Sequence, residues 1–212
     1  MADAPVVAVR GEAYREAAPE LARFTVTATA RDRDRETTLT RLAERAAAVR
    51  ALLDAAEPAV ERRETGQVHV WPVTKRSGDR VVAYQGSVST TVTTTDFTVL
   101  GDLMLRLADQ EQVEVAGPVW SLRPDSPAYR EVRQAAIADA LVRAREYAEA
   151  LGARVIALRE LSDTGMSAGP PMMVKAAYAR SGEQPELELD PAPQPVQASV
   201  EARFTISEPV LG

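Results

Sequence analysis

The segment that most constrains the fold is VQASVEARFTI, residues 196–206, because its side chains alternate strictly between two kinds. A period of two places the apolar residues on one face of a β-strand and the polar residues on the other. One face of the sheet must then pack against the core while the other is exposed to water, which is typical of an antiparallel sheet. The apolar set is Val196, Ala198, Val200, Ala202, Phe204 and Ile206.

Other segments with strand character precede this one. LARFTVTATA repeats the period of two, and Val7 and Val9 alternate with polar or small neighbours near the start. Because only EAAPE separates these two segments, we expect them to pair as an antiparallel hairpin. The turn residues of TKRSGDR predict a second hairpin between QVHVWPV and RVVAYQGSVSTTVTT. VEVAGPVWSL and ARVIALREL are predicted to be further strands.

Three segments have the period of an amphipathic helix. The first follows Asp34, a predicted N-cap, and closes at Pro58. The second is short, and we expect Asp96 to cap it. The third begins at Ser126, an N-cap followed by proline, and ends at Gly152. Their apolar stripes comprise Leu39, Leu42, Ala46, Val49 and Leu53; Phe97, Leu100, Leu103, Met104 and Leu107; and Val132, Ala136, Ile137, Ala140, Leu141, Ala144, Ala148 and Leu151.

The predicted order is therefore β-β-α-β-β-α-β-α-β-loop-β. Such an order indicates an α+β fold with mostly antiparallel sheets and helices packed on one face. We expect one domain over residues 1–212, built either as one body or as two lobes. In the two-lobe alternative, the helix before Pro58 lies in a lobe apart from the sheet formed by the later strands. Between 162 and 195 the periodicity disappears and Gly, Pro and acidic residues dominate, which predicts a long mobile loop.

Charge and composition exclude several classes of function. The net charge of −6 argues against nucleic acid as a partner, which requires clustered Lys and Arg. The chain has no cysteine, so disulfides, thiolate metal sites and thiol nucleophiles are excluded. No segment approaches the length of a membrane span, and no signal peptide is visible. We therefore expect a soluble, cytoplasmic protein, or one of the envelope or periplasm if a leader was removed.

GMSAG, residues 165–169, matches the G-x-S-x-G pattern of a hydrolase nucleophile elbow and makes Ser167 a candidate nucleophile. The elbow needs a helix after the serine, but Pro170 and Pro171 follow and no helical period comes next. The hydrolase order also needs a histidine after the serine, whereas the single histidine, His69, precedes it. The pattern therefore favours a flexible segment over a catalytic one.

Metal and cofactor sites lack a motif. His69 has no second histidine or cysteine to share a metal ion. RDRDRE contains an Asp-x-Asp pair but lacks the glycine and distal glutamate of a calcium loop. Neither G-x-G-x-x-G nor a P-loop is present. We expect no catalytic, cofactor-binding or metal-binding residues.

Several of these segments, in this order, resemble the SIMPL domain family. The resemblance lies in VRGEA, PELARFTVTATA, YQGSVSTTV, DFTVLGDLMLRL, VAGPVWSL, the Ala-rich AYREVRQAAIADALVRAREYAEALG and the terminal VQASVEARFTI. It implies an α+β fold without established catalytic residues. It also implies proteins that are often found in the bacterial envelope, some of which self-assemble. This sequence differs from the envelope members because no signal segment is visible.

Three hypotheses of function follow. The leading one is a non-enzymatic assembly or protein-interaction module that forms homo-oligomers through exposed strand edges, with the 162–195 loop contacting a protein partner. The alternative is a small-ligand-binding protein with a pocket between sheet and helices, around Trp71, Tyr84 and Trp120. The third is a serine hydrolase that uses Ser167.

Overall fold

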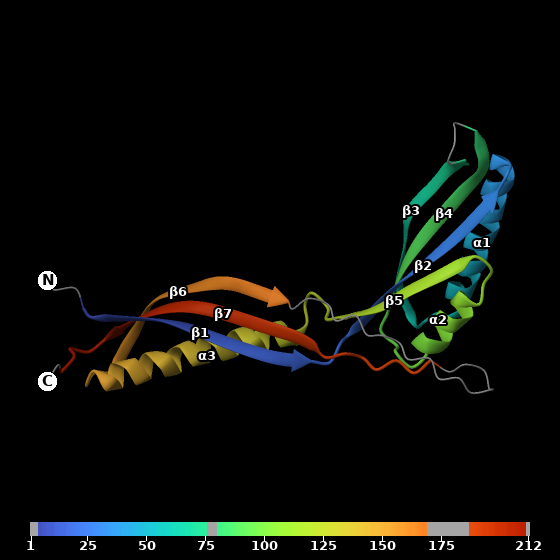
Figure 1. The fold of residues 1–212 in the computed structure, drawn as a ribbon. Coiled ribbons are helices and arrows are strands. Elements are labelled where there is room, and N and C mark those ends of the chain that lie inside the picture. The colour runs from blue at the N-terminus through green and yellow to red at the C-terminus, as the bar shows by residue number, and fades with distance from the viewer. Residues whose placement is uncertain (1–3, 76–79, 169–186, 211–212) are drawn as a thin grey trace. The chain divides into compact units, whose positions relative to one another are not determined.

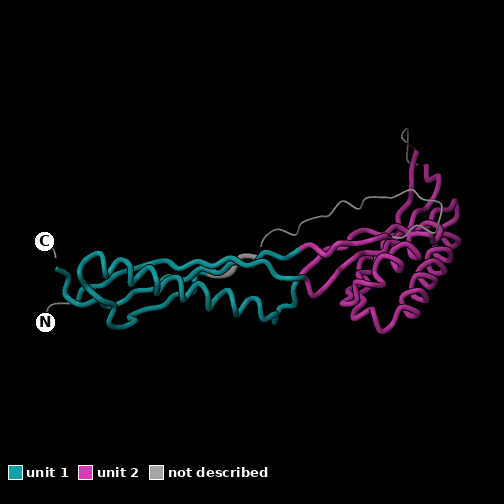
Figure 2. Tube along the Cα trace, turned by 90° about the horizontal axis from the view of Figure 1, so that it is seen from below, with its two compact units in different colours: residues 1–18, 122–170, 193–212 teal, residues 19–121, 171–192 magenta. Residues whose placement is uncertain are grey.

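The computed structural model describes residues 4–75, 80–168 and 187–210. These residues form three helices and seven strands in two antiparallel sheets, so the predicted α+β class is confirmed. The chain divides into two compact units, shown in teal and magenta in Figure 2. Unit 1 comprises residues 1–18, 122–170 and 193–212, and unit 2 comprises residues 19–121 and 171–192.

Unit 1 is a three-stranded sheet with one helix on its inner face (Figure 1). Its elements are β1 (Val6–Ala17), α3 (Pro127–Ala150), β6 (Val155–Ala168) and β7 (Gln194–Ile206), with the strands in the order β1-β7-β6. The alternation of β7 is confirmed, because all six of its alternate apolar residues are buried. Five of them, from Val196 to Phe204, form the core of unit 1 together with Val9 of β1 and most of the buried stripe of α3.

Small residues bring α3 close to β1. The buried stripe of α3 repeats every four residues and is mostly alanine: Ala128, Val132, Ala136, Ala140, Ala144 and Ala148. Gly11 of β1 lies directly beneath it. A β-carbon placed on Gly11 would lie 2.1 Å from the Ala136 carbonyl oxygen and 2.5 Å from the Ala140 nitrogen. The two backbones therefore pack closely enough to exclude any side chain at this position.

Unit 2 is a four-stranded sheet in the order β3-β4-β2-β5. Its elements are β2 (Leu21–Asp32), α1 (Arg35–Ala55), β3 (Val60–Thr74), β4 (Val81–Thr94), α2 (Leu100–Ala108) and β5 (Val113–Ser121). Both helices contribute to one core, which buries Phe24, Val92, Leu53, Leu100 and Leu107. The placement of α1 shows that the helix before Pro58 packs with the later strands and does not form a separate lobe.

Residues 187–192, which we call the strap, belong to unit 2. Leu189 and Ala192 pack against its core. A β-carbon on Gly101, in α2, would lie 2.0 Å from the Leu187 carbonyl oxygen. Gly101 therefore provides the space in which the strap crosses α2.

Two of the three predicted helix caps are confirmed. The Asp34 carboxylate accepts a hydrogen bond from the Thr37 backbone N–H at 2.8 Å, and the Ser126 hydroxyl accepts one from the Ala128 N–H. The Asp96 cap is wrong, because α2 begins later, with Val99 at the N-cap position. Asp96 instead accepts hydrogen bonds from the backbone N–H and hydroxyl of Thr98, a local turn that competes with capping.

Two other expectations about strands are also wrong. The first two strands do not form a hairpin: β1 pairs with β7, and β2 pairs with β4 and β5 in the other sheet. The predicted loop is too long, because residues 162–168 belong to β6 and residues 194–195 to β7. The pairing of β6 with β7 shifts register between Asp163 and Met166. Apolar and polar residues do not alternate across such an irregularity, so the sequence shows no strand pattern there.

Candidate functional site

The structure places Ser167 in a strand. Its backbone lies in β6 opposite Gln197 of β7, and the strand continues to Ala168. A nucleophile elbow instead requires the serine at a sharp turn from strand to helix. His69 lies in β3, which belongs to unit 2, whereas β6 belongs to unit 1. Residues 169–186, the middle of the predicted loop, lie outside the described residues, so a partner bound through that loop stays a prediction.

The three aromatic residues predicted to line a pocket do not gather. Trp120 is 3% exposed and stacks edge-on against Phe97, with ring centroids 4.8 Å apart. Trp71 is 40% exposed and has His69 as its aromatic neighbour. Along β2, Trp120 lies opposite Ala22 and Tyr84 opposite Asp32, which at about 3.3 Å per residue separates them by roughly 33 Å. They serve local packing and line no shared cavity.

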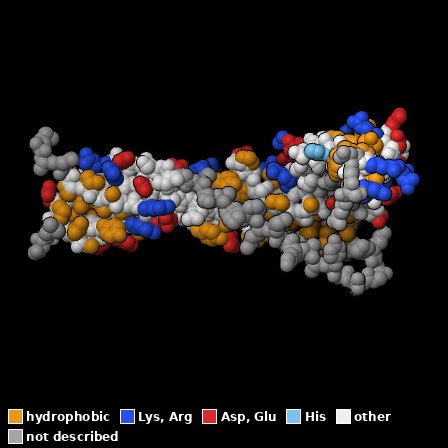
Figure 3. All heavy atoms as spheres, turned by 45° about the horizontal axis from the view of Figure 1, so that its top comes forward, with side chains coloured by type: hydrophobic (Ala, Val, Ile, Leu, Met, Phe, Trp, Pro, Cys, Tyr) orange, Lys and Arg blue, Asp and Glu red, His pale blue; other side chains and the backbone are white. Residues whose placement is uncertain are grey.

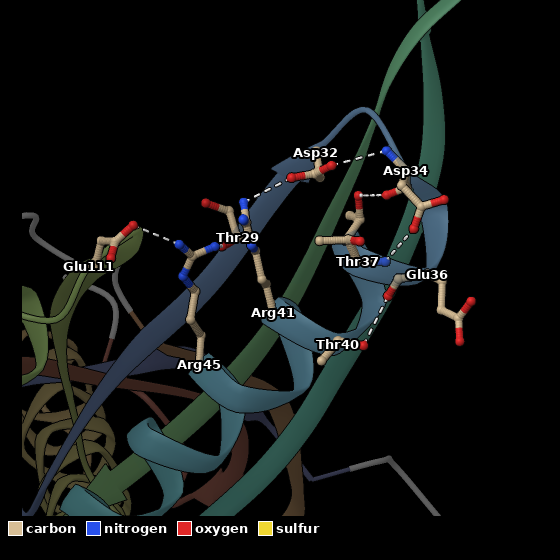
Figure 4. Close-up of polar contacts among 10 residues, drawn as sticks. Thr29, Asp32, Asp34, Glu36, Thr37, Thr40, Arg41, Arg45 and Glu111 are labelled. Atoms are coloured by element: carbon tan, nitrogen blue, oxygen red, sulfur yellow. Dashed lines mark hydrogen bonds and ion pairs between the residues drawn. The ribbon is translucent and has the colours of Figure 1, made fainter.

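A polar groove of about 520 Å³ lies beside α1 and the segment before β5. Figure 4 shows the contacts near it: Arg41 forms an ion pair with Asp32, and Arg45 reaches from α1 to Glu111 and the Thr29 carbonyl oxygen. The N–O distances are 2.9, 2.8 and 2.9 Å, respectively. These guanidinium groups are engaged in holding α1 onto β2 and the following turn, which favours a structural role.

The same end of α1 perturbs one carboxyl group. The backbone N–H and then the side chain of Thr37 donate hydrogen bonds that hold the pKa of Asp34 below its ordinary value. Hydrogen bonds to the charged form stabilise it, and the positive end of the helix dipole acts in the same sense. This shift follows from capping. Among the described residues, no group of three or more acidic or histidine side chains could hold a metal ion.

The edges of both sheets are less open to pairing than we expected. In β1, the Glu12 N–H donates to the Asp139 carboxylate at 2.9 Å, so a side chain of α3 occupies the middle of that edge. β3 and β6 each show three register irregularities in their pairing, and β3 also contains Pro72. β5 is nine residues long and contains Pro118. Bulges, prolines and inward carboxylates are common devices that prevent edge-to-edge pairing.

Unit 1 has instead an uncovered apolar surface on the inner side of β6. Hydrophobic side chains are exposed on the left part of the molecule in Figure 3, which is unit 1. A groove of about 430 Å³ between α3 and β6 is lined mostly by hydrophobic residues. Four of its large apolar side chains are substantially exposed: Ile137 at 42%, Ile156 at 61%, Leu158 at 54% and Leu161 at 45%. We call this surface the α3–β6 groove.

The position of α3 explains why this groove exists. The close approach at Gly11 holds the helix over β1 and β7, and Asp139 fixes it further to β1. The inner face of β6 therefore extends beyond the cover of a single helix. Sequence reasoning missed this site, although a signal was present. Ile137 and Leu141 lie to one side of the alanine stripe and widen the apolar face of the helix. ARVIALREL is also rich in apolar residues, although a single helix has to cover three strands.

Comparison with known proteins gives one extensive match. The family model SIMPL, described as a protein of unknown function (DUF541), matches residues 7–204. No curated protein sequence matches the chain. None of the described helices is long and apolar enough to span a membrane.

Solved structures resemble the chain only distantly. The designed protein Foldit4 is 15% identical, with a TM-score of 0.24, and the match covers 44% of this chain and 93% of the designed one. A hydantoinase/carbamoylase family amidase from Burkholderia ambifaria is 15% identical, with a TM-score of 0.28, over 52% of this chain and 28% of the amidase. An amidase of the hydantoinase/carbamoylase family from Burkholderia phymatum is 14% identical, with a TM-score of 0.31, over 65% of this chain and 36% of the amidase.

Proposed function

The chain belongs to the SIMPL family of proteins of unknown function, and on that premise we propose that it is a non-enzymatic assembly module that self-associates through the α3–β6 groove. The observation that carries the proposal is the concentration of exposed leucine and isoleucine side chains on one side of unit 1.

Burial of this surface would stabilise an association. Scattered apolar side chains are normal on protein surfaces, but a contiguous apolar patch marks an interaction site. Ile137, Leu158 and Leu161 come from two elements and meet in one groove. Each square ångström of apolar area removed from water contributes about 25 cal/mol, before the costs of association. The groove therefore offers the apolar centre that a protein interface needs.

The irregular strand edges favour association through side chains. Pairing of two edges would require regular, unbulged strands, whereas β6 departs from register three times and the β1 edge is occupied by Asp139. The groove has no such obstacle. We infer that copies contact each other through the layer of side chains between α3 and β6.

The test is the mass in solution of the full chain, by light scattering after size exclusion. We expect a multimer for the wild type and a monomer, or a much weaker multimer, for Leu158→Asp, because the substitution places a charge in the interface. The matched control is Val68→Asp, which changes an apolar residue that is 62% exposed on β3 of unit 2 and should leave the mass unchanged. A monomeric wild type at high micromolar concentration would falsify the proposal.

A further inference from the structure

We propose that the α3–β6 groove also binds the anion of a straight-chain fatty acid, whose carboxylate pairs with Arg145, and that the bound chain keeps copies of the protein apart. The ligand site stands on the groove itself, whereas its effect on assembly rests on the proposed self-association. The inference follows from the irregular pairing of β6 and from a single charge in an otherwise apolar lining.

Two register irregularities in β6 direct three apolar side chains toward α3. Residues three apart in a regular strand project to opposite faces, because the period is two. In β6 an extra residue, Ile156 in one case and Arg159 in the other, restores the same face. The three side chains lie opposite buried residues of β7 and so share their face of the sheet. They are Val155, Leu158 and Leu161, opposite Ile206, Phe204 and Ala202.

The helix contributes one ridge to the groove, and this ridge ends in a charge. Ile137, Leu141 and Arg145 follow one another at intervals of four residues, or about 6 Å along the helix axis. Residues at this spacing lie on the same face of a helix. Of the described residues that line the groove, ten are apolar and one, Arg145, is charged. The groove therefore combines a long apolar surface with a single positive group.

Arg145 is free to bind a ligand. No ion pair or hydrogen bond joins its guanidinium group to any other residue that the structure describes. The residue is exposed, so its N–H donors are available at the rim of the groove while its aliphatic stem can lie along apolar surface. The apolar lining continues past it at Val155 and Ile156 of β6. A carboxylate would therefore bind beside the helix, with its head group still in contact with water.

The chemistry of the lining favours an acyl chain over a peptide. A peptide main chain placed in the groove would lose its hydrogen bonds to water, and ten apolar side chains offer no replacement. It could not add as a regular strand to the edge at β6 either, because that strand departs from register three times. An acyl chain has no polar group along its length, and its carboxylate matches the guanidinium fork. The volume of about 430 Å³ lies within the range of small-ligand sites.

The bound chain would compete with self-association. It would cover Leu158 and Leu161, which are the exposed side chains that the proposed interface buries. A ligand that binds only the separated copies shifts the equilibrium toward them by mass action. We therefore expect the fatty-acid anion to convert the multimer to monomers.

Calorimetric titration of the full chain tests the ligand site, with sodium dodecanoate kept below its critical micelle concentration. We expect saturation at one dodecanoate per chain. Decanoate, which is shorter by two CH₂ groups, should bind about 4- to 15-fold more weakly, because each buried CH₂ changes the dissociation constant by about two- to fourfold. Equal dissociation constants for the two chain lengths would show that the groove does not bury the chain.

Reversal of the charge tests the role of Arg145. Arg145→Glu should weaken dodecanoate binding by about tenfold or more and should make dodecyltrimethylammonium the tighter ligand, whereas the wild type prefers dodecanoate. A variant that had merely lost its fold would not exchange one preference for the other. The matched control is Arg130→Glu, which makes the same charge change at an exposed position of α3 outside the groove, 15 residues or about 22 Å away. It should bind dodecanoate as the wild type does.

Light scattering with and without dodecanoate separates this inference from the proposed function. A wild type that is a monomer yet binds dodecanoate through Arg145 would overturn self-association and leave the ligand site standing. A multimer that does not bind dodecanoate, or whose Arg145→Glu variant binds it equally well, would overturn the site and leave self-association standing. Binding without a change of mass would overturn the competition. Binding to vesicles of phosphatidylglycerol and phosphatidylcholine, but not to dodecanoate, would assign the groove to a membrane surface and overturn the proposal.

Discussion

Gly11, which has no side chain, lies where β1 packs against α3. The two nearest atoms that a β-carbon would meet belong to the backbone of α3, which cannot rotate away. We therefore expect Gly11→Ala to destabilise the protein by about 1–3 kcal/mol, the usual cost of overpacking. Urea unfolding followed by circular dichroism measures this difference.

The control for that substitution is Gly66→Ala. A β-carbon there would meet the Ser89 hydroxyl oxygen at 2.6 Å, and a hydroxyl on a rotatable side chain is displaced easily. Gly66→Ala should therefore cost less than Gly11→Ala. Equal costs would show that the close approach of α3 to β1 does not govern the stability of unit 1.

Asp34 makes the stability of α1 depend on pH. Its pKa is lowered in the folded protein by the hydrogen bonds from Thr37, so its contribution is present above the pKa of the unfolded chain, about 3.9. The contribution is lost as the pH falls through the lower, folded pKa. Asp34→Ala should therefore be less stable than the wild type at pH 7, with the difference shrinking below pH 4.

Asp34→Asn separates the hydrogen bond from the charge. Asparagine also caps helices well, so this variant should retain most of the stability at pH 7. Unfolding midpoints in urea at several pH values measure both variants. A difference between wild type and Asp34→Ala that stays constant from pH 7 to pH 3 would contradict the role of the titrating cap.

At the scale of elements, the strap depends on the glycine of α2. Gly101→Ala places a methyl group only 2.0 Å from the Leu187 carbonyl oxygen, so the strap must move. We expect faster proteolytic cleavage between 187 and 192, because segments that lose their packing become accessible to proteases. Mass spectrometry of the fragments identifies the site, and Gly66→Ala provides the comparison.

Features that depend on neighbouring residues could be predicted from the sequence, whereas features that depend on contacts between distant segments could not. The buried face of β7, the stripe of α3 and the caps at Asp34 and Ser126 follow from neighbouring residues, and the sequence predicts them correctly. The pairing of β1 with β7 joins residues that are 177 to 199 positions apart, and proximity along the chain predicted a hairpin instead. The α3–β6 groove was missed because its cause, the lateral position of α3, lies in a contact between distant segments.

At the scale of the molecule, a destabilising substitution in one unit should leave the stability of the other unit unchanged. Leu53→Ala removes a buried side chain of unit 2 and should cost about 2–5 kcal/mol. We expect hydrogen exchange to accelerate in β2 and β4, while β1 and β7 remain protected. Phe204→Ala, in unit 1, should cost about 3–5 kcal/mol and produce the opposite pattern. Acceleration of all strands by either substitution would indicate a single cooperative body.

The pairing of β1 with β7 also has a consequence for synthesis on the ribosome. Most of unit 2, residues 19–121, is translated before β7, the strand with which β1 pairs. We expect nascent chains stalled before β7 to contain a folded unit 2 and a protease-sensitive β1 segment. β1 must therefore wait until β7 has been translated, and a premature stop codon before β7 would leave β1 without its pairing partner.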